Sequence, residues 1–200
     1  MTSGARSVLL GLLLVPALVP ALVPGLCAAQ SWDLQSLMGE MAAVPASRVR
    51  FVETRQLALL TRPLELKGSL TYERPHRLTK HVESPFDELL SVDGEVLSLI
   101  NRTKGEQRTV SLREQPALGA LVASVRATLA GDRAQLERHY RVKFSGAREA
   151  WQLQLAPRES QLRAHVESIA LSGAGARLQR IEVLESGGDS SVMSILHDGK

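Results

Sequence analysis

Five histidines are the residues of this chain best suited to binding a metal ion or transferring a proton. They are His76, His81, His139, His165 and His197. No two of them have the i, i+4 spacing that places two imidazoles on one face of a helix, and none belongs to a Cys/His cluster. The sequence therefore predicts no metal site, and nothing in it indicates a cofactor.

Motifs of nucleophilic and phosphate chemistry are also missing. The chain contains no Gly-x-Ser-x-Gly sequence, which forms the nucleophile turn of serine hydrolases. A Gly-x-Gly pattern occurs in Ser172-Gly173-Ala174-Gly175, but it separates two predicted strands, so we expect a hairpin turn there. Glu53 is an acid within an otherwise structural stretch, and a role as general base in a cavity stays open. We therefore expect that the protein has no catalytic residue and is not an enzyme.

The first 29 residues have the pattern of a secretory signal peptide. The segment from Val8 to Leu26 is apolar and follows a positive charge, and the small residues of Cys27-Ala28-Ala29 come before Gln30. Two alternatives remain. The apolar segment is long enough to span a membrane, although three prolines interrupt it. Cys27 could carry a lipid, although Leu26 stands where a lipobox has a small residue.

Cleavage after Ala29 predicts a secreted protein with a single mature domain of residues 30–200, which suits the periplasm. The one cysteine of the chain would leave with the signal peptide, so the mature protein has no disulfide. The formal net charge is +3, and neither clustered basic residues nor interleaved aromatic residues are visible. We therefore expect no nucleic-acid partner.

One stretch, from Phe51 to Lys80, gives the clearest structural signal. From Leu64 to Tyr72 its apolar residues alternate with polar ones, which is the pattern of a strand with one buried face and one exposed face. Arg74-Pro75 ends this strand because proline cannot donate a hydrogen bond to a sheet. The preceding strand, from Val49 to Leu59, can pair with it as a hairpin.

Further strands with turn residues between them follow. Asp93-Gly94 is a typical two-residue hairpin loop. The strands expected after Tyr72 cover 77–83, 89–92, 96–100, 107–112, 141–144, 150–155, 164–171, 177–184 and 190–196. About eleven strands without a linker or repeat favour one strongly curved antiparallel sheet, or an open barrel.

Two helical regions interrupt the strand pattern. Ser31 can cap a helix that carries an apolar stripe and ends near Val44-Pro45. A second helix begins at Pro116, is apolar on nearly all sides, and ends at Gly131, which predicts a buried position. A capping box at Asp132 begins a short third helix that ends at about Tyr140.

The mature chain resembles the LolA family of periplasmic carriers of outer-membrane lipoproteins, in the order of its helices and strands and most clearly from Phe51 to Leu99. The resemblance lies in the order and spacing of Phe51-x-Glu53, Pro63-Leu64, Gly68-x-Leu70-x-Tyr72, Arg74-Pro75, Val92-Asp93-Gly94 and the Leu97–Leu99 strand. The family typically has glutamine where this chain has Glu53, and its cavity contains more aromatic residues. In these departures the chain resembles a divergent LolA-like branch, which is associated with lipid or acylated-pigment export.

The resemblance implies an open antiparallel β-barrel of about eleven strands, with a helical lid over an apolar cavity. The helix from Ser31 and the insert from Pro116 to about Tyr140 would form this lid. By resemblance, Arg74 is the lid latch, which hydrogen-bonds to the lid and couples its closure to cargo release. The residues expected to contact acyl chains are Phe51, Leu64, Leu66, Leu70, Tyr72, Trp151 and Leu153. Those expected on the inner side of the lid are Leu118, Leu121, Val122 and Val125.

By this resemblance we expect a monomeric carrier that shuttles acylated lipoproteins, or related acylated lipids, from the inner to the outer membrane. Its partners would be the cargo, an inner-membrane exporter and an outer-membrane acceptor. One alternative is a LolA-like sensor or adaptor that binds an acylated ligand and regulates an envelope protein. Another is an enzyme acting on an envelope lipid or glycan, with Glu53 as the catalytic acid.

Overall fold

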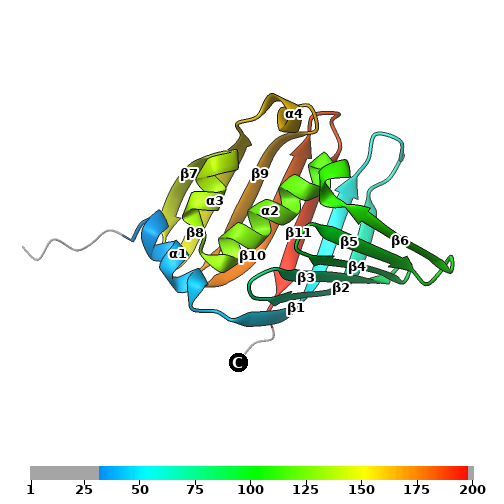
Figure 1. Ribbon diagram of the computed structural model, residues 1–200, viewed down its shortest axis with the longest axis horizontal. Helices are drawn as coiled ribbons and strands as arrows, with labels where there is room; N and C mark the ends of the chain where they lie inside the picture. The colour runs from blue at the N-terminus through cyan, green and yellow to red at the C-terminus, as the bar shows by residue number, and fades with distance from the viewer. Residues whose placement is uncertain (1–31, 198–200) are drawn as a thin grey trace, which may run out of the picture. The chain divides into compact units, whose positions relative to one another are not determined.

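The computed structural model describes residues 32–197, which form one antiparallel sheet of eleven strands with helices on its concave face (Figure 1). The strands are β1 (Ala46–Gln56), β2 (Leu64–Glu73), β3 (Arg77–Ser84), β4 (Glu88–Asp93), β5 (Val96–Asn101), β6 (Glu106–Ser111), β7 (Tyr140–Ala147), β8 (Ala150–Pro157), β9 (Val166–Ala174), β10 (Arg177–Glu185) and β11 (Ser190–Leu196). The helices are α1 (Leu34–Ala42), α2 (Pro116–Ala130), α3 (Arg133–His139) and α4 (Ser160–Arg163), with a 3-10 turn η1 (Leu112–Glu114). The predicted signal peptide and Ser31 lie outside the described residues.

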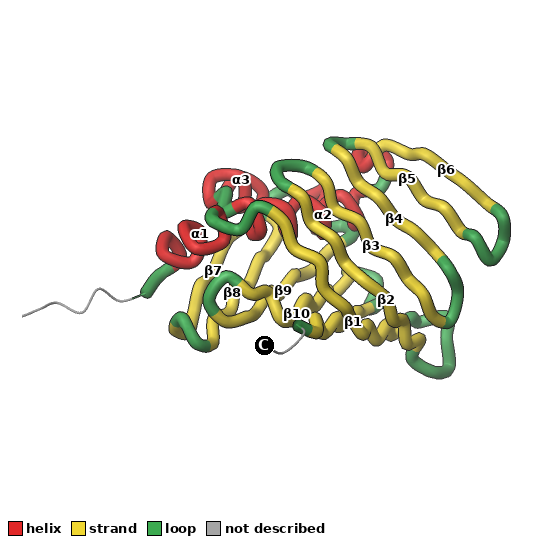
Figure 2. The backbone as a smooth tube through the Cα atoms, turned by 90° about the horizontal axis from the view of Figure 1, so that it is seen from below, coloured by secondary structure: helices red, strands yellow, loops and turns green. Residues whose placement is uncertain are grey.

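The strand order explains why helices cover the sheet. The order is β6-β5-β4-β3-β2-β1-β11-β10-β9-β8-β7, so the first and last strands pair in the middle and β6 and β7 form the two edges. The chain leaves one edge at Ser111 and enters the other at Tyr140. The residues between these two points must cross the sheet. At 1.5 Å per residue, α2 alone spans about 22 Å of this distance. Figure 2 shows the helices on one side of the curved sheet.

The predicted fold class is confirmed: the sheet is antiparallel, open and curved. β2 has the predicted bounds, and it pairs with β1 from Ala46↔Glu73 to Arg55↔Leu64. β1 ends at Gln56, three residues before the predicted end at Leu59. The apolar run from Leu57 to Leu60 forms a turn instead, closed by a 2.9 Å hydrogen bond from the Leu60 amide to the Leu57 carbonyl oxygen.

Three local details differ from the sequence prediction. The helix cap is Asp33, whose carboxylate accepts a hydrogen bond from the amide of Ser36. The β4–β5 loop is Gly94-Glu95 because Gly94 takes the positive φ (+59°) at the first loop position. The predicted start of the ninth strand, Ala164, instead follows the unpredicted helix α4. Asp132 caps α3 as expected, through the Gln135 amide.

The bounds of α2 agree with the prediction because both ends have strong local signals. Pro116 takes the first helical position, where no amide donor is needed, and Gly131 ends the helix with a φ of +69°. The helix is buried on several sides, and its two buried hydroxyl groups bond within the helix. Ser124 donates to the Leu121 carbonyl oxygen and Thr128 donates to that of Ser124.

Candidate functional site

A cavity of about 1040 Å³ lies between α2 and the concave face of the sheet. The strands that line it are β1 to β5 on one side and β10 and β11 on the other. Alternate residues of these strands face it, because successive side chains of a strand point to opposite faces. Most of the wall is apolar; its members include Leu66, Leu70, Leu78, Val82, Leu90, Leu178, Ile181, Val183, Met193 and Ile195.

Three of the seven residues expected to contact acyl chains line this cavity: Leu66, Leu70 and Tyr72. The other four, Phe51, Leu64, Trp151 and Leu153, are not among its lining residues. Phe51, Trp151 and Leu153 are fully buried members of the main core, and Leu64 packs against that core. β8, which carries Trp151 and Leu153, lies in the part of the sheet that α1 and α3 cover (Figure 1).

All four residues expected on the inner side of the lid face the cavity from α2. These residues are Leu118, Leu121, Val122 and Val125. The wall also contains apolar residues that the sequence analysis did not single out, such as Leu78, Val82 and Leu90. The alternation within 77–83 and 89–92 was a signal that could have identified them. The role of these side chains in binding acyl chains stays a prediction.

Tyr72 adds a hydroxyl group to the cavity wall. The side chain is 2% exposed, and its oxygen has no hydrogen-bond partner within residues 32–197. Burial raises the pKa of this hydroxyl above its ordinary value, so the group is neutral. An unsatisfied buried hydroxyl destabilises a fold, and it is available to a ligand that offers a polar atom.

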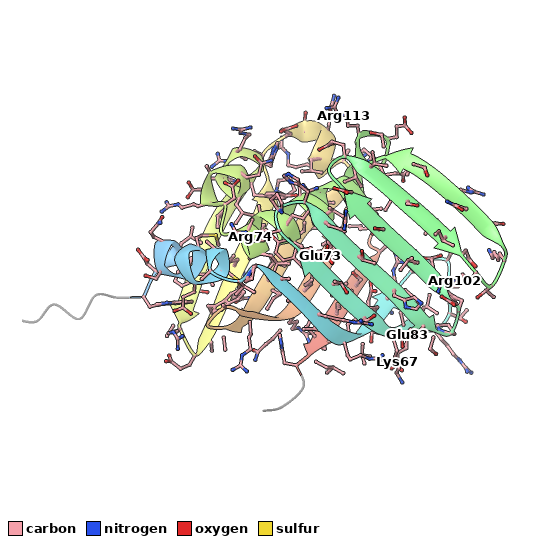
Figure 3. The ribbon with its side chains drawn as sticks, turned by 60° about the horizontal axis from the view of Figure 1, so that its bottom comes forward. Lys67, Glu73, Arg74, Glu83, Arg102 and Arg113 are labelled. Atoms are coloured by element: carbon pink, nitrogen blue, oxygen red, sulfur yellow. The ribbon has the colours of Figure 1, made fainter. Side chains whose placement is uncertain are left out.

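Arg74 joins the C-terminal ends of α1 and α2. Its Nη1 donates to the carbonyl oxygen of Ala42, the last residue of α1. Its Nη2 donates to the carbonyl oxygen of Ala130, the last residue of α2, at 3.3 Å. These carbonyl groups have no partner within their own helices and carry the negative end of the helix dipole, so a guanidinium group is well matched to them. Figure 3 shows Arg74 beside the end of α1.

Gly131 allows the two helix ends to meet at this point. A Cβ atom at residue 131 would lie 2.2 Å from the carbonyl oxygen of Met38 and 2.8 Å from the Cβ of Ala42, both in α1. Such distances are shorter than van der Waals contact. A glycine at the end of α2 therefore brings α1 close enough for Arg74 to reach both helices.

The opposite side of α1 is held by Glu40. Its carboxylate accepts hydrogen bonds from Nε of Arg148 at 2.7 Å and from the indole of Trp32 at 3.2 Å. The bond from Arg148 lowers the pKa of Glu40 below its ordinary value. Because Arg148 belongs to the turn between β7 and β8, this contact fixes α1 to the sheet.

Charged residues also line the cavity, among them Glu53, Arg55 and Lys80. Glu53 is 5% exposed, and one of its oxygens accepts a hydrogen bond from Nζ of Lys80. The Lys80 ammonium also lies 5.2 Å from the centre of the Phe51 ring. Arg55 lines the cavity as well, with its Nε 4.0 Å from the other oxygen of Glu53. Glu53 is therefore held by cations and does not resemble a free general base.

Two further features bear on the type of site. No group of three or more His, Cys, Asp or Glu residues in the described part of the chain is arranged to hold a metal ion. Between residues 32 and 197, no helix is long and apolar enough to cross a membrane.

Sequence comparison connects this architecture with carrier proteins. The sequence profile described as "Outer membrane lipoprotein carrier protein LolA-like" matches residues 26–197. An outer-membrane lipoprotein carrier protein of Cupriavidus pinatubonensis is 26% identical over 129 residues. That match covers 64% of this chain and 57% of the relative, so it spans less than two thirds of the relative's length.

Solved structures with a similar fold share little sequence with this chain. The LolA superfamily protein NE2245 from Nitrosomonas europaea has a TM-score of 0.42 and 12% identity, over 83% of this chain and 93% of that chain. A putative outer membrane lipoprotein-sorting protein domain from Vibrio parahaemolyticus has a TM-score of 0.46 and 8% identity, over 84% and 90%. Because both scores are low, the assignment rests on the family profile. That profile extends from residue 26 to the end of the described residues, and the chain therefore belongs to the LolA-like family of outer-membrane lipoprotein carrier proteins.

Proposed function

We propose that this protein is a periplasmic carrier that holds the acyl chains of lipoproteins, or of related acylated lipids, and moves them from the inner to the outer membrane. The observation that carries the proposal is the apolar cavity under α2. Its volume of about 1040 Å³ is at the upper end of the roughly 300–1,000 Å³ of ligand pockets. Leucine, isoleucine, valine and methionine side chains of the wall suit acyl chains rather than polar ligands.

The free energy of burying an acyl chain limits how tightly a carrier can hold its cargo and still release it. Burying a chain of about 16 carbons is worth roughly 12 kcal/mol before any cost is subtracted. A carrier that kept all of this energy would not release its cargo. Part of it must therefore be offset when the cargo enters, and moving α1 and α2 away from the sheet provides such a cost.

The contacts of Arg74 suit a change between an empty and a loaded state of the carrier. Its guanidinium joins the ends of α1 and α2, and in this proposal that arrangement is the closed lid. Cargo that enters between α2 and the sheet would separate these helix ends and break the hydrogen bonds. Reforming them would favour release. By this mechanism cargo passes from an inner-membrane exporter to an outer-membrane acceptor, with the carrier acting as a monomer.

Substitution of one cavity residue tests the proposal. In Leu70→Glu a carboxylate replaces an apolar side chain in the wall, and it would lose its hydration when an acyl chain binds. We expect the affinity for a fluorescent acyl probe to fall at least about tenfold. Titration of the delipidated protein with the probe measures the effect, with circular dichroism as the check on folding.

Leu59→Glu is the matched control. Leu59 is 97% exposed in the β1–β2 loop, so the same change there adds the same charge outside the cavity. We expect this variant to bind the probe as the wild type does. Normal uptake of the probe by a folded Leu70→Glu variant would contradict acyl binding in this cavity.

A further inference from the structure

Arg55 differs from its neighbouring arginine on the same strand in having no strong partner. Its guanidinium makes no hydrogen bond to any residue in the range 32–197, and its one ion pair is the 4.0 Å contact with Glu53. The side chain is 39% exposed and lines the cavity. Arg50, on the opposite face of β1, donates to both carboxylate oxygens of Glu83, at 2.9 and 3.2 Å.

Around Arg55 the cationic groups outnumber the carboxylate that they share. Lys80 and Arg55 both approach Glu53, whereas the wall as a whole contains four cationic and four acidic side chains. Ser191, the register partner of Arg55 on β11, also lines the cavity and adds a hydroxyl group. Hydrogen-bond donors therefore exceed acceptors at this end of β1.

The remaining charged residues of the wall are Arg48, Glu88, Glu114, Arg177 and Glu185, and none of these three carboxylates is within ion-pair distance of Arg55 or Lys80. Glu88 accepts a hydrogen bond from the Asn101 amide at 3.3 Å. Glu114 and Glu185 form no ion pair with a described residue, and neither lies within ion-pair distance of Arg55. Arg48 is seven residues from Arg55 on β1, or roughly 24 Å away at the rise of an extended strand. The cationic group at Arg55 is therefore local.

A charged group beside an apolar binding surface has an energetic consequence. A neutral acyl chain that covers Arg55 would remove water from the guanidinium without offering a partner, which is costly. A chain that ends in a carboxylate or a phosphate would offer two oxygens in the geometry that guanidinium binds best.

We propose that Arg55, with Ser191 and Lys80, forms a binding site for an anionic group attached to the acyl chain of the cargo. The group is a carboxylate or a phosphate, which bind guanidinium through the same pair of hydrogen bonds. This inference rests on the proposed function, because it assigns the polar end of a ligand whose apolar part occupies the same cavity. Glu53 then holds Lys80 through their hydrogen bond and leaves Arg55 available to the ligand.

The test compares two probes that differ in charge and share the same chain. Parinaric acid and its methyl ester are titrated at pH 8 into delipidated wild-type protein, and into Arg55→Met and Arg50→Met. We expect the wild type to bind the acid about tenfold more tightly than the ester. Arg55→Met should lose this preference and bind the ester at least as tightly as the wild type does, because no guanidinium is then desolvated. Arg50→Met should keep the wild-type preference. Dodecyl phosphate and dodecanol, measured by displacement of the ester probe, show whether phosphate is preferred to carboxylate.

The outcomes separate this inference from the proposed function. Equal affinity of the wild type for acid and ester, or an equal loss of both in Arg55→Met, would overturn the anion site and leave the acyl carrier in place. Failure of every probe to bind the wild type would overturn the carrier itself. Partial recovery of the acid preference in Arg55→Lys would support a charge effect at this position.

Discussion

Two buried tyrosines show how differently the same side chain can be used in this fold. Tyr140 is 1% exposed, and its hydroxyl donates to the carbonyl oxygen of Ala120 in α2 at 2.8 Å. Tyr72 is equally buried, but its hydroxyl has no partner in the described part of the chain. The first hydroxyl fixes α2 to the sheet, whereas the second destabilises the empty protein.

Substitution of each tyrosine by phenylalanine tests this difference. Tyr72→Phe removes an unsatisfied polar group, so we expect the free energy of unfolding of the empty protein to stay equal or rise by about 1 kcal/mol. Tyr140→Phe removes the hydrogen bond to Ala120 and leaves a cavity of the same size as Tyr72→Phe does. It should therefore lower the free energy of unfolding by about 1 kcal/mol. Urea denaturation measures both values. A clear loss of stability in Tyr72→Phe would mean that its hydroxyl is bonded in solution.

The face of the sheet to which a side chain points was predictable where the alternation of apolar and polar residues alone decides it. The pattern from Leu64 to Tyr72 correctly placed Leu66, Leu70 and Tyr72 on the inner face of β2. The same pattern cannot distinguish an inner face that lines a cavity from one that a helix covers. Trp151 and Leu153 point inward as well, but they pack in the core.

At the scale of elements, the C-terminal ends of two helices meet at one point. α1 and α2 end side by side because Gly131 leaves room for α1, and Arg74 joins their last carbonyl groups. On its other side α1 is held by Glu40 and Arg148. Loss of Arg74 should therefore loosen the helix ends while α1 stays anchored to the β7–β8 turn.

Arg74→Ala tests the latch directly. We expect amide hydrogen exchange to become faster in the last turns of α1 and α2, because their carbonyl groups lose a charged donor. Release of an acyl probe should become about tenfold slower, because the hydrogen bonds that favour release can no longer form; this is the size expected for a hydrogen bond to a charged group. Hydrogen-exchange mass spectrometry and stopped-flow fluorescence measure the two effects.

Arg77→Ala is the control for this substitution. Arg77 lies three residues away and forms exposed ion pairs with Glu73 and Asp93, without contacting a helix. We expect it to behave as the wild type in both measurements. If Arg74→Ala and Arg77→Ala behaved alike, Arg74 would not act as a latch.

The bounds of elements were predictable where local chemistry decides them. Pro116 and Gly131 mark the ends of α2, and Arg74-Pro75 marks the end of β2. The apolar run from Leu57 to Leu60 was assigned to a strand because its composition favours one. Its true conformation depends on a distant residue: the Ala58 amide donates to the carboxylate of Asp189 at 2.7 Å. A local sequence pattern cannot predict this contact, because the two residues are far apart in the sequence.

At the scale of the whole fold, the strand order links the sheet to its covering helices. β1 and β11 pair although most of the described chain lies between them, and this pairing was beyond reach of the sequence because no local signal specifies it. It places the free edges at β6 and β7, and so requires the connecting segment to cross the concave face. The cavity results from this crossing, since α2 covers the sheet without filling the space beneath it.

The central claim is that this cavity carries acylated cargo in the cell. Native mass spectrometry of the protein purified from periplasm, followed by organic extraction of any bound molecule, tests it most directly. We predict a complex of one protein with one acylated molecule, which extraction releases as a lipoprotein or a lipid. An unliganded mass, together with no uptake of an added fluorescent acyl probe, would contradict the carrier function.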